Sequence, residues 1–240
     1  MLNERFMRTS ILLGNEGMNK IYSSKVMIVG LGAVGGYALE AIARSGVGHI
    51  VLVDFDSFDI TNINRQLLAT EVSIGHFKTE VAAERIAQIN PNCKIEKLNV
   101  FVDEKTIPDL LKINPDFVID AIDSLDSKAA LIEALVHRNI PFISSMGAAL
   151  KTDSSKILTT TLNKTQNCGL AKQLRHRLRR NNVNLAKVNC VYSCEPVDFS
   201  ATSQKEEHNR KSIMGSLPTI TAIFGLTLAN YVILKLAGKR

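Results

Sequence analysis

"VMIVGLGAVGGYALEAIARSG", residues 26–46, joins a short apolar run to a helical pattern through a glycine-rich turn. The run from Val26 to Val29 is too short for an independent helix and predicts a buried strand of a parallel sheet. The apolar residues that follow fall on one helical face and are Val34, Leu39, Ile42 and Ala43. Gly46 supplies the stop for this helix. The stretch therefore predicts a strand, a tight turn and an amphipathic helix, in that order.

The glycines of the turn, Gly30, Gly32 and Gly35, have the spacing G-x-G-x-x-G. Because they lack side chains, the turn can tighten and backbone N–H groups can approach an anion at the helix N-terminus. The next apolar run, "HIVLVDFD", reaches Asp54, whose carboxylate can accept hydrogen bonds from ribose hydroxyls. This combination predicts a nucleotide-binding turn, and the alternative is a glycine-rich turn without a ligand.

Strand and helix signals alternate along the first two thirds of the chain. Further strands are predicted at 50–53, 93–102, 116–122 and 141–145, and further helices at about 77–89 and 126–138. This alternation predicts a doubly wound, Rossmann-like, mostly parallel α/β sheet with an elaborated C-terminal part. We expect a single domain, with a nucleotide-binding part at about 1–147 and a C-terminal extension at about 148–240. The extension holds two strand-like runs, "KILTTTL" and "VNCVYSC", and a polar loop at 200–212.

The overall composition fits one globular core. The chain has 240 residues, 45% of them hydrophobic, and a formal net charge of +6 that suits an anionic partner such as RNA. Its four cysteines show no dense pairing and the N-terminus lacks an apolar signal core, so we expect a cytoplasmic protein.

One segment, 217–234, has eighteen residues without a charge and reaches the lower length limit of a membrane span. It also contains Pro218, Asn230 and three threonines, which favours a buried core helix. Peripheral or C-terminal membrane association is the alternative.

The chemistry served by the turn is indicated by the residues after Asp54. Asn62, Arg65 and Lys78 lie within one connection, and such a set of donors suits a triphosphate attacked at its α-phosphorus better than a nicotinamide dinucleotide. No G-x-x-x-x-G-K-[ST] sequence is present, so an ATP site here would be built without a P-loop.

Two carboxylates close the predicted strand at 116–122. Asp123 is expected at the sheet edge where phosphates would lie, and it could hold magnesium or instead cap the next helix. For Asp120 we expect a structural role.

These motifs resemble those of the ThiF/MoeB/HesA superfamily of ubiquitin-activating-type adenylating enzymes. The similarity covers about residues 5–147 and comprises "GLGAVG", "VDFD", "TNINRQ", "IGHFK", "INP" and "DAIDS". Within the superfamily, "TEVAAERIAQINP", "DAIDSLDSKAALI" and "CVYSCEPV" look most like the tRNA threonylcarbamoyladenosine dehydratases.

The resemblance implies a role for each matching position. Gly30, Gly32 and Gly35 would cradle phosphate, Asp54 would hold the ATP ribose, Asn62, Arg65 and Lys78 would neutralise the phosphates, and Asp123 would bind Mg²⁺. An arginine near the N-terminus would enter the site of the neighbouring subunit. Arg8 is the preferred residue, with Arg5 the alternative, and both could equally belong to a solvated N-terminal arm.

The implied reaction activates a carboxylate with ATP and Mg²⁺ and releases AMP and pyrophosphate. In the dehydratases the carboxylate belongs to threonylcarbamoyladenosine in a tRNA anticodon loop, and ring closure follows with net loss of water. The resemblance also implies a homodimer, a possible monovalent cation (Na⁺ or K⁺) and a possible sulfur-transfer partner.

A basic helix is predicted at 169–182, with one face of Leu170, Leu174 and Leu178. Its remaining surface carries the candidate tRNA-binding residues Lys172, Arg175, Arg177, Arg179 and Arg180, and the alternative is a merely solvated face.

Cysteine spacing gives no zinc signature, because Cys190 and Cys194 have no second pair, and no zinc is expected. Cys168 could form a thioester, although a plain loop cysteine is the preferred interpretation. Two other functions stay open on the sequence alone. One is activation of a ubiquitin-like sulfur-carrier protein, and the other is a nucleotide-sensing or NAD-binding module.

Overall fold

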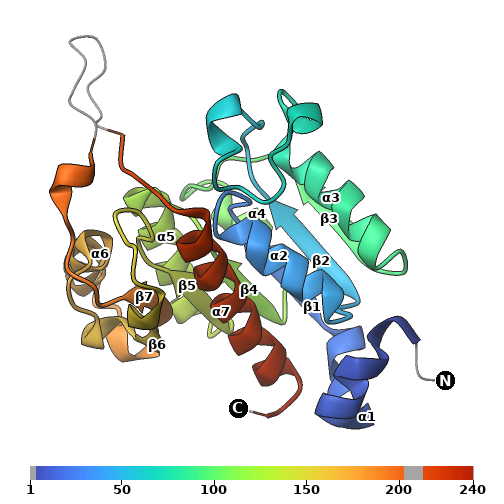
Figure 1. Ribbon diagram of the computed structural model, residues 1–240. Coiled ribbons are helices and arrows are strands. Elements are labelled where there is room, and N and C mark those ends of the chain that lie inside the picture. Colours follow the sequence, from blue (N-terminus) through green and yellow to red (C-terminus); the bar gives the residue numbers. More distant parts are fainter. Residues whose placement is uncertain (1–3, 203–212, 240) are drawn as a thin grey trace.

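A seven-stranded sheet forms the centre of the molecule (Figure 1), and the computed structural model describes residues 4–202 and 213–239. The strand order is β3-β2-β1-β4-β5-β7-β6. All neighbours are parallel except β6 and β7. The strands are β1 (Lys25–Val29), β2 (His49–Val53), β3 (Lys94–Leu98), β4 (Phe117–Asp120), β5 (Phe142–Ser145), β6 (Ile157–Thr161) and β7 (Asn189–Ser193). The predicted Rossmann-like, mostly parallel sheet is confirmed.

Helices cover both faces of the sheet. One face packs against α1 (Met7–Ser23), α2 (Gly35–Arg44), α3 (Lys78–Ile89) and α7 (Pro218–Leu236). The other face packs against α4 (Ile107–Lys112), α5 (Leu125–His137) and α6 (Gly169–Arg180). The helices that connect β1 to β2 and β2 to β3 therefore lie on one face, and those that connect β3 to β4 and β4 to β5 lie on the other, which is the doubly wound arrangement.

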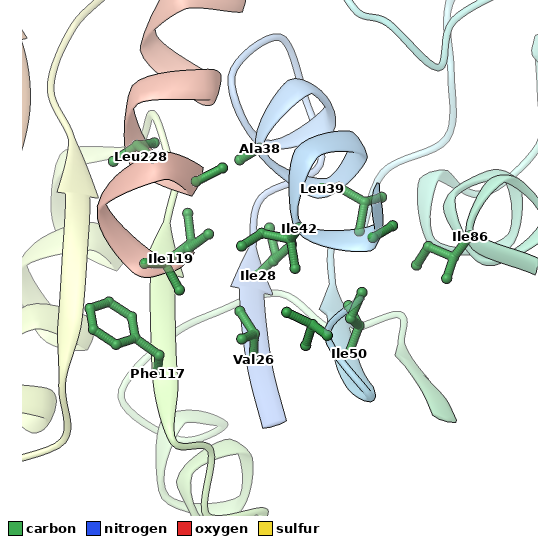
Figure 2. Close-up of a cluster of buried hydrophobic side chains, with 14 of the residues drawn as sticks. Val26, Ile28, Ala38, Leu39, Ile42, Ile50, Ile86, Phe117, Ile119 and Leu228 are labelled. Carbon is green, nitrogen blue, oxygen red and sulfur yellow. The ribbon is translucent and has the colours of Figure 1, made fainter. Parts of the chain in front are cut away.

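The apolar run of β1 explains why the sheet is buried on both sides. Val26 and Ile28 face α2 and α7, as Figure 2 shows, whereas Met27 and Val29 belong to the cluster beneath α4 and α5. Because successive side chains of a strand alternate between faces, a strand covered twice must be apolar at every position.

The uncharged C-terminal segment forms α7, which packs on the sheet and crosses α2. A Cβ atom at Gly225 would meet the Val34 carbonyl and would lie 2.8 Å from Cβ of Tyr37, so the two helices touch through their backbones. Within the described residues, α7 is the helix long and apolar enough to cross a membrane, and 44% of that window is buried. Its contacts with the core agree with the preferred interpretation of this segment.

Three details differ from the sequence predictions or lie beyond them. Helices α1 and α4 were not predicted, and α1 is interrupted at Gly14, which has φ of 78° and ψ of 164°. The predicted strand at 93–102 is shorter, because only Lys94–Leu98 pairs with β2. Most of the predicted polar loop at 200–212 lies outside the described residues, since the description stops at 202 and resumes at 213.

Candidate functional site

The glycine turn lies between β1 and α2, at the carboxyl edge of the sheet. Gly30 has φ of 89° and donates its N–H to the Val53 carbonyl at 2.8 Å. A Cβ at Gly30 would lie 2.8 Å from the Ala121 carbonyl oxygen, and one at Gly35 would overlap the carbonyl of Gly30. These two glycines are therefore required by the turn itself. Gly32 has no such clash, because a Cβ there would meet only the side-chain amide of Gln66, with Nε2 at 3.8 Å and Oε1 at 4.0 Å.

Asp54 follows β2 directly and connects it to the turn. Its Oδ2 accepts the Leu31 N–H at 2.6 Å, and its Oδ1 accepts the Asp56 N–H at 2.9 Å. The residue is 9% exposed, so the carboxylate is fixed beside the turn. Each oxygen retains acceptor capacity, because a carboxylate oxygen accepts two hydrogen bonds. The predicted ribose contact is compatible with this geometry.

Lys78 is the first residue of α3 and is held toward the same edge. Its Nζ donates to Oδ2 of Asp56 at 3.0 Å, and its N–H donates to the Asp56 carbonyl at 3.0 Å. The side chain is buried, and Asp56 follows β2 by three residues. The ammonium is thus pre-positioned by the segment that also carries Asp54.

Asn62 and Arg65 lie on the connection between β2 and α3. Asn62 ends a short 3₁₀ helix and accepts the Asp59 N–H, while Nη1 of Arg65 donates to the Thr61 carbonyl and to Oδ1 of Asn64, both at 2.9 Å. Arg65 is half-buried and, after the two hydrogen bonds of Nη1, retains three further N–H donors for an anion.

Asp123 and Asp120 separate into two roles. Asp123 is exposed in the loop between β4 and α5 and has no hydrogen bond within residues 4–202 and 213–239. The N-cap of α5 is Ser124, so Asp123 does not cap this helix and the helix-cap alternative is wrong. Asp120 is fully buried and pairs with Lys128, in agreement with the expected structural role.

Magnesium fits Asp123 only together with a nucleotide. The described part of the chain contains no group of three His, Cys, Asp or Glu residues that could hold a metal ion. Mg²⁺ binds commonly through one or two carboxylates plus substrate phosphates and water, and one exposed, unbonded carboxylate suits that chemistry.

An aromatic pair beside Asp54 was missed from the sequence. Phe55 and Phe101 contact edge to face with ring centroids 4.9 Å apart, and both are about half exposed. They extend from the carboxyl ends of β2 and β3, where a purine base could lie against them. The position of Phe55, directly after the predicted ribose-binding Asp54, could have indicated a contact with the nucleotide. Its partner Phe101 is distant in the sequence, so the pair itself could not have been predicted.

The two N-terminal arginines differ in their surroundings. Nη1 of Arg5 donates to the Ile89 carbonyl at 2.9 Å, at the end of α3, whereas Arg8 is exposed on α1. Helix α1 precedes the amino end of β1, so it lies at the opposite edge of the sheet from the glycine turn (Figure 1). Arg8 therefore cannot serve the turn of its own chain.

The basic helix α6 begins beside the carboxyl end of β5, where a Cβ at Gly147 would lie 3.7 Å from Cβ of Leu170. Leu174 and Leu178 are buried, together with Ala171, and Leu170 is partly buried. Arg175 is engaged, because it donates to the carbonyl and hydroxyl of Thr165. Nη2 of Arg177 lies 3.9 Å from Oδ1 of Asp126.

The three cysteines of the extension, Cys168, Cys190 and Cys194, differ in burial. The buried Cys168 caps α6, its Sγ accepting the Ala171 N–H at 3.5 Å. Burial raises the pKa of the Cys190 thiol to about 12, and Cys194 is half-buried.

Comparison with known proteins agrees with this arrangement. The ThiF family model matches residues 4–240. The tRNA threonylcarbamoyladenosine dehydratase of Bacillus subtilis is 38% identical over 240 residues, covering 97% of this chain and 94% of that protein. The solved structure of the Escherichia coli tRNA N6-threonylcarbamoyladenosine dehydratase with ATP has a TM-score of 0.90 and 34% identity, covering 98% of this chain and 95% of that one.

The molybdopterin-synthase adenylyltransferase of Haemophilus influenzae is 34% identical over 138 residues, which are 58% of this chain and 56% of that protein. Because the family model covers almost the whole sequence, this chain belongs to the ThiF family.

Proposed function

We propose that this protein is an ATP-dependent tRNA dehydratase. It would activate the carboxylate of threonylcarbamoyladenosine in a tRNA anticodon loop and close it into a ring, releasing AMP and pyrophosphate. The observation that carries the proposal is the extent of the similarity, which spans nearly the full length of a dehydratase but little more than half of a molybdopterin-synthase adenylyltransferase. Substrate differences between ThiF enzymes are expected where their chains diverge.

In the first step a carboxylate oxygen attacks the α-phosphorus of ATP and pyrophosphate leaves. The N–H groups of the glycine turn and of the first turn of α2 would bind the phosphates, and Asp54 would accept the ribose hydroxyls. The buried ammonium of Lys78 and the guanidinium of Arg65 would stabilise the charge that builds up on the phosphates, assisted by Asn62. Magnesium held by Asp123 would supply further neutralisation of the phosphates.

In the second step the carbamoyl group of the same substrate attacks the activated carboxyl carbon and AMP leaves. No protein nucleophile is needed, because the attacking group is already tethered to its target at a high effective concentration. The burial of Cys168 in the cap of α6 supports this description, since a thioester-forming thiol must be accessible.

We further propose that the chain acts as one adenylating domain, because β6 and β7 of the extension (148–240) join the sheet of the nucleotide-binding part (1–147). The tRNA would lie along α6, which begins beside the carboxyl edge and whose Lys172, Arg179 and Arg180 are exposed. Arg177 would contribute less to tRNA binding, because it lies near Asp126. Arg175 would contribute mainly to the fold, through its hydrogen bonds to Thr165.

The assembly we propose is a cytoplasmic homodimer, in which Arg8 enters the neighbouring site. Its exposure on α1, far from its own glycine turn, supports this role in trans. A monovalent cation and a sulfur-transfer partner remain parts of the proposal that follow from the resemblance.

The test incubates the protein with ATP, Mg²⁺ and total tRNA and then analyses the nucleosides by mass spectrometry. Threonylcarbamoyladenosine should lose one water in step with AMP formation, and Lys78→Ala should abolish both. Unaltered nucleosides with intact ATP binding would reject the dehydratase proposal. Pyrophosphate exchange that depends on a carrier protein ending in Gly-Gly would instead indicate activation of a sulfur carrier.

A further inference from the structure

The side-chain amide of Gln66 is a buried polar group beside the glycine turn. Gln66 is 8% exposed, and its Oε1 is buried without a hydrogen-bond partner among the described residues. The backbone of the residue is separately secured, because its N–H donates to the Asn62 carbonyl at 2.9 Å and its carbonyl accepts the Ala69 N–H at 3.0 Å. A buried, unpaired amide is unfavourable for folding. The unpaired amide of Gln66 is therefore explained better by a ligand than by folding.

The amide lies against the glycine turn. A Cβ atom at Gly32 would be 3.8 Å from Nε2, 3.9 Å from Cδ and 4.0 Å from Oε1 of Gln66. All three amide atoms are nearly equidistant, so the flat face of the amide packs against the Cβ side of Gly32. This is the one glycine of the turn whose side chain would not clash with the backbone.

The amide thus adjoins the place where the proposed phosphates would lie. Gln66 directly follows Arg65 in the sequence. The carbonyl of Gly32 accepts the N–H of Gly36 at 3.0 Å, so Gly32 lies at the start of the first turn of α2. Within the described residues Nε2 makes no hydrogen bond, so its two N–H donors are available to a ligand.

We propose that Gln66 is a phosphate-binding residue, whose Nε2 donates to the phosphate chain of ATP beside Gly32. This inference rests on the proposed use of ATP. A neutral donor adds hydrogen bonds to the phosphates without adding to the charge of Arg65 and Lys78. The carboxamide would then serve ATP binding, although its unpaired Oε1 destabilises the free protein.

Two variants test this inference in opposite ways. Gln66→Met keeps the length of the side chain but removes both the donor and the unpaired acceptor. Gln66→Glu keeps the shape and replaces the donor by an oxygen that repels phosphate. The control is Gln88→Glu, which makes the same chemical change at an exposed position of α3. Dissociation constants for ATP with Mg²⁺ and for adenosine are measured by NMR titration without tRNA, together with the Tm.

We expect Gln66→Met to weaken ATP binding about tenfold or more, the effect of losing a hydrogen bond to a charged group. Gln66→Glu should weaken it further, while Gln88→Glu should leave it unchanged. Adenosine affinity should be unaffected in all variants, and the Tm of Gln66→Met should equal or exceed that of the wild type.

A merely structural glutamine gives another pattern. A lower Tm for Gln66→Met with unchanged ATP affinity would overturn the inference, as would equal losses for ATP and adenosine or a wild-type protein that does not bind ATP. Because tRNA is absent, ATP binding that depends on Gln66 would support the inference even where tRNA dehydration fails and the proposed function falls.

Discussion

The ammonium of Lys128 and the carboxylate of Asp120 lie 2.7 Å apart, and both side chains are fully buried between α5 and the sheet. The Ser144 hydroxyl donates to the same carboxylate oxygen at 2.6 Å, and the Ile122 N–H donates to the other oxygen at 3.1 Å. The pair therefore links β4, β5 and α5 and fixes the start of the loop that carries Asp123.

Replacing Lys128 by Met should destabilise the protein strongly. The change leaves a buried carboxylate without its cation, which costs about 3–5 kcal/mol. Urea unfolding measures the loss, and the double variant Lys128→Met, Asp120→Asn should recover part of it, because no charge is then buried. A loss below about 1 kcal/mol for Lys128→Met would show that the pair is not buried as described.

Gly225→Ala tests the packing of α7 on α2. The added methyl group meets the Val34 carbonyl and approaches Cβ of Tyr37, so we expect about 1–3 kcal/mol of destabilisation from overpacking. Leu226→Ala is the control, because Leu226 is 47% exposed and should change the stability by less than Gly225→Ala. Thermal unfolding compares the two. Equal effects would contradict a close α2–α7 contact.

The basic helix α6 yields a prediction that separates binding from folding. Changing Lys172, Arg179 and Arg180 together to alanine should weaken tRNA binding and make its salt dependence shallower by about one unit per lost phosphate contact. The Tm should stay unchanged, because these side chains are exposed. Arg175→Ala should instead lower the Tm, since it breaks the hydrogen bonds to Thr165. Fluorescence anisotropy across a salt series measures the binding, and unaltered affinity in the triple variant would exclude α6.

The ion pairs of Glu40 with Arg85 and Arg44 should make the free energy of unfolding decrease at acidic pH. Burial alone would raise its pKa, but hydrogen bonds from Arg85 and Arg44 outweigh burial and hold the pKa below the ordinary 4.5. The unfolded chain then binds the proton more readily, so the pair stabilises the protein above pH 4.5 and the stabilisation is lost as the pH falls through the folded value. Glu40→Gln should therefore be less stable than the wild type near pH 7, and the difference should shrink as the pH falls below 4.5. A constant difference in unfolding free energy over this range would contradict the ion pairing.

Much of the nucleotide-binding half could be predicted because its signals are local. The strand, glycine turn and helix at 26–46 are specified by neighbouring residues, and alternation of such units defines a doubly wound sheet. The positions of Asp54 and Lys78 at the carboxyl edge could be predicted for the same reason, since each adjoins the end or the start of a recognisable element.

Features that depend on tertiary contacts could not be predicted. Helix α1 contains Gly14 and Gly17, which disfavour a helix locally, and it is stabilised by packing, with Gly17 against Ala237 near the C-terminus. The contact of Phe55 with Phe101 joins the loops that follow β2 and β3, and that of Lys128 with Asp120 joins α5 to β4. Spacing along the chain carries no signal for either pair.

The central claim is that a substrate carboxylate attacks the α-phosphorus of ATP at the glycine turn. Threonylcarbamoyladenosine in tRNA, labelled with ¹⁸O in its carboxylate, is incubated with the protein, ATP and Mg²⁺, and the released nucleotides are analysed by mass spectrometry. We expect one ¹⁸O atom in AMP for each ring closed, because the attacking oxygen leaves with AMP. Label found in inorganic phosphate beside ADP, or ring closure with unlabelled AMP, would contradict the account.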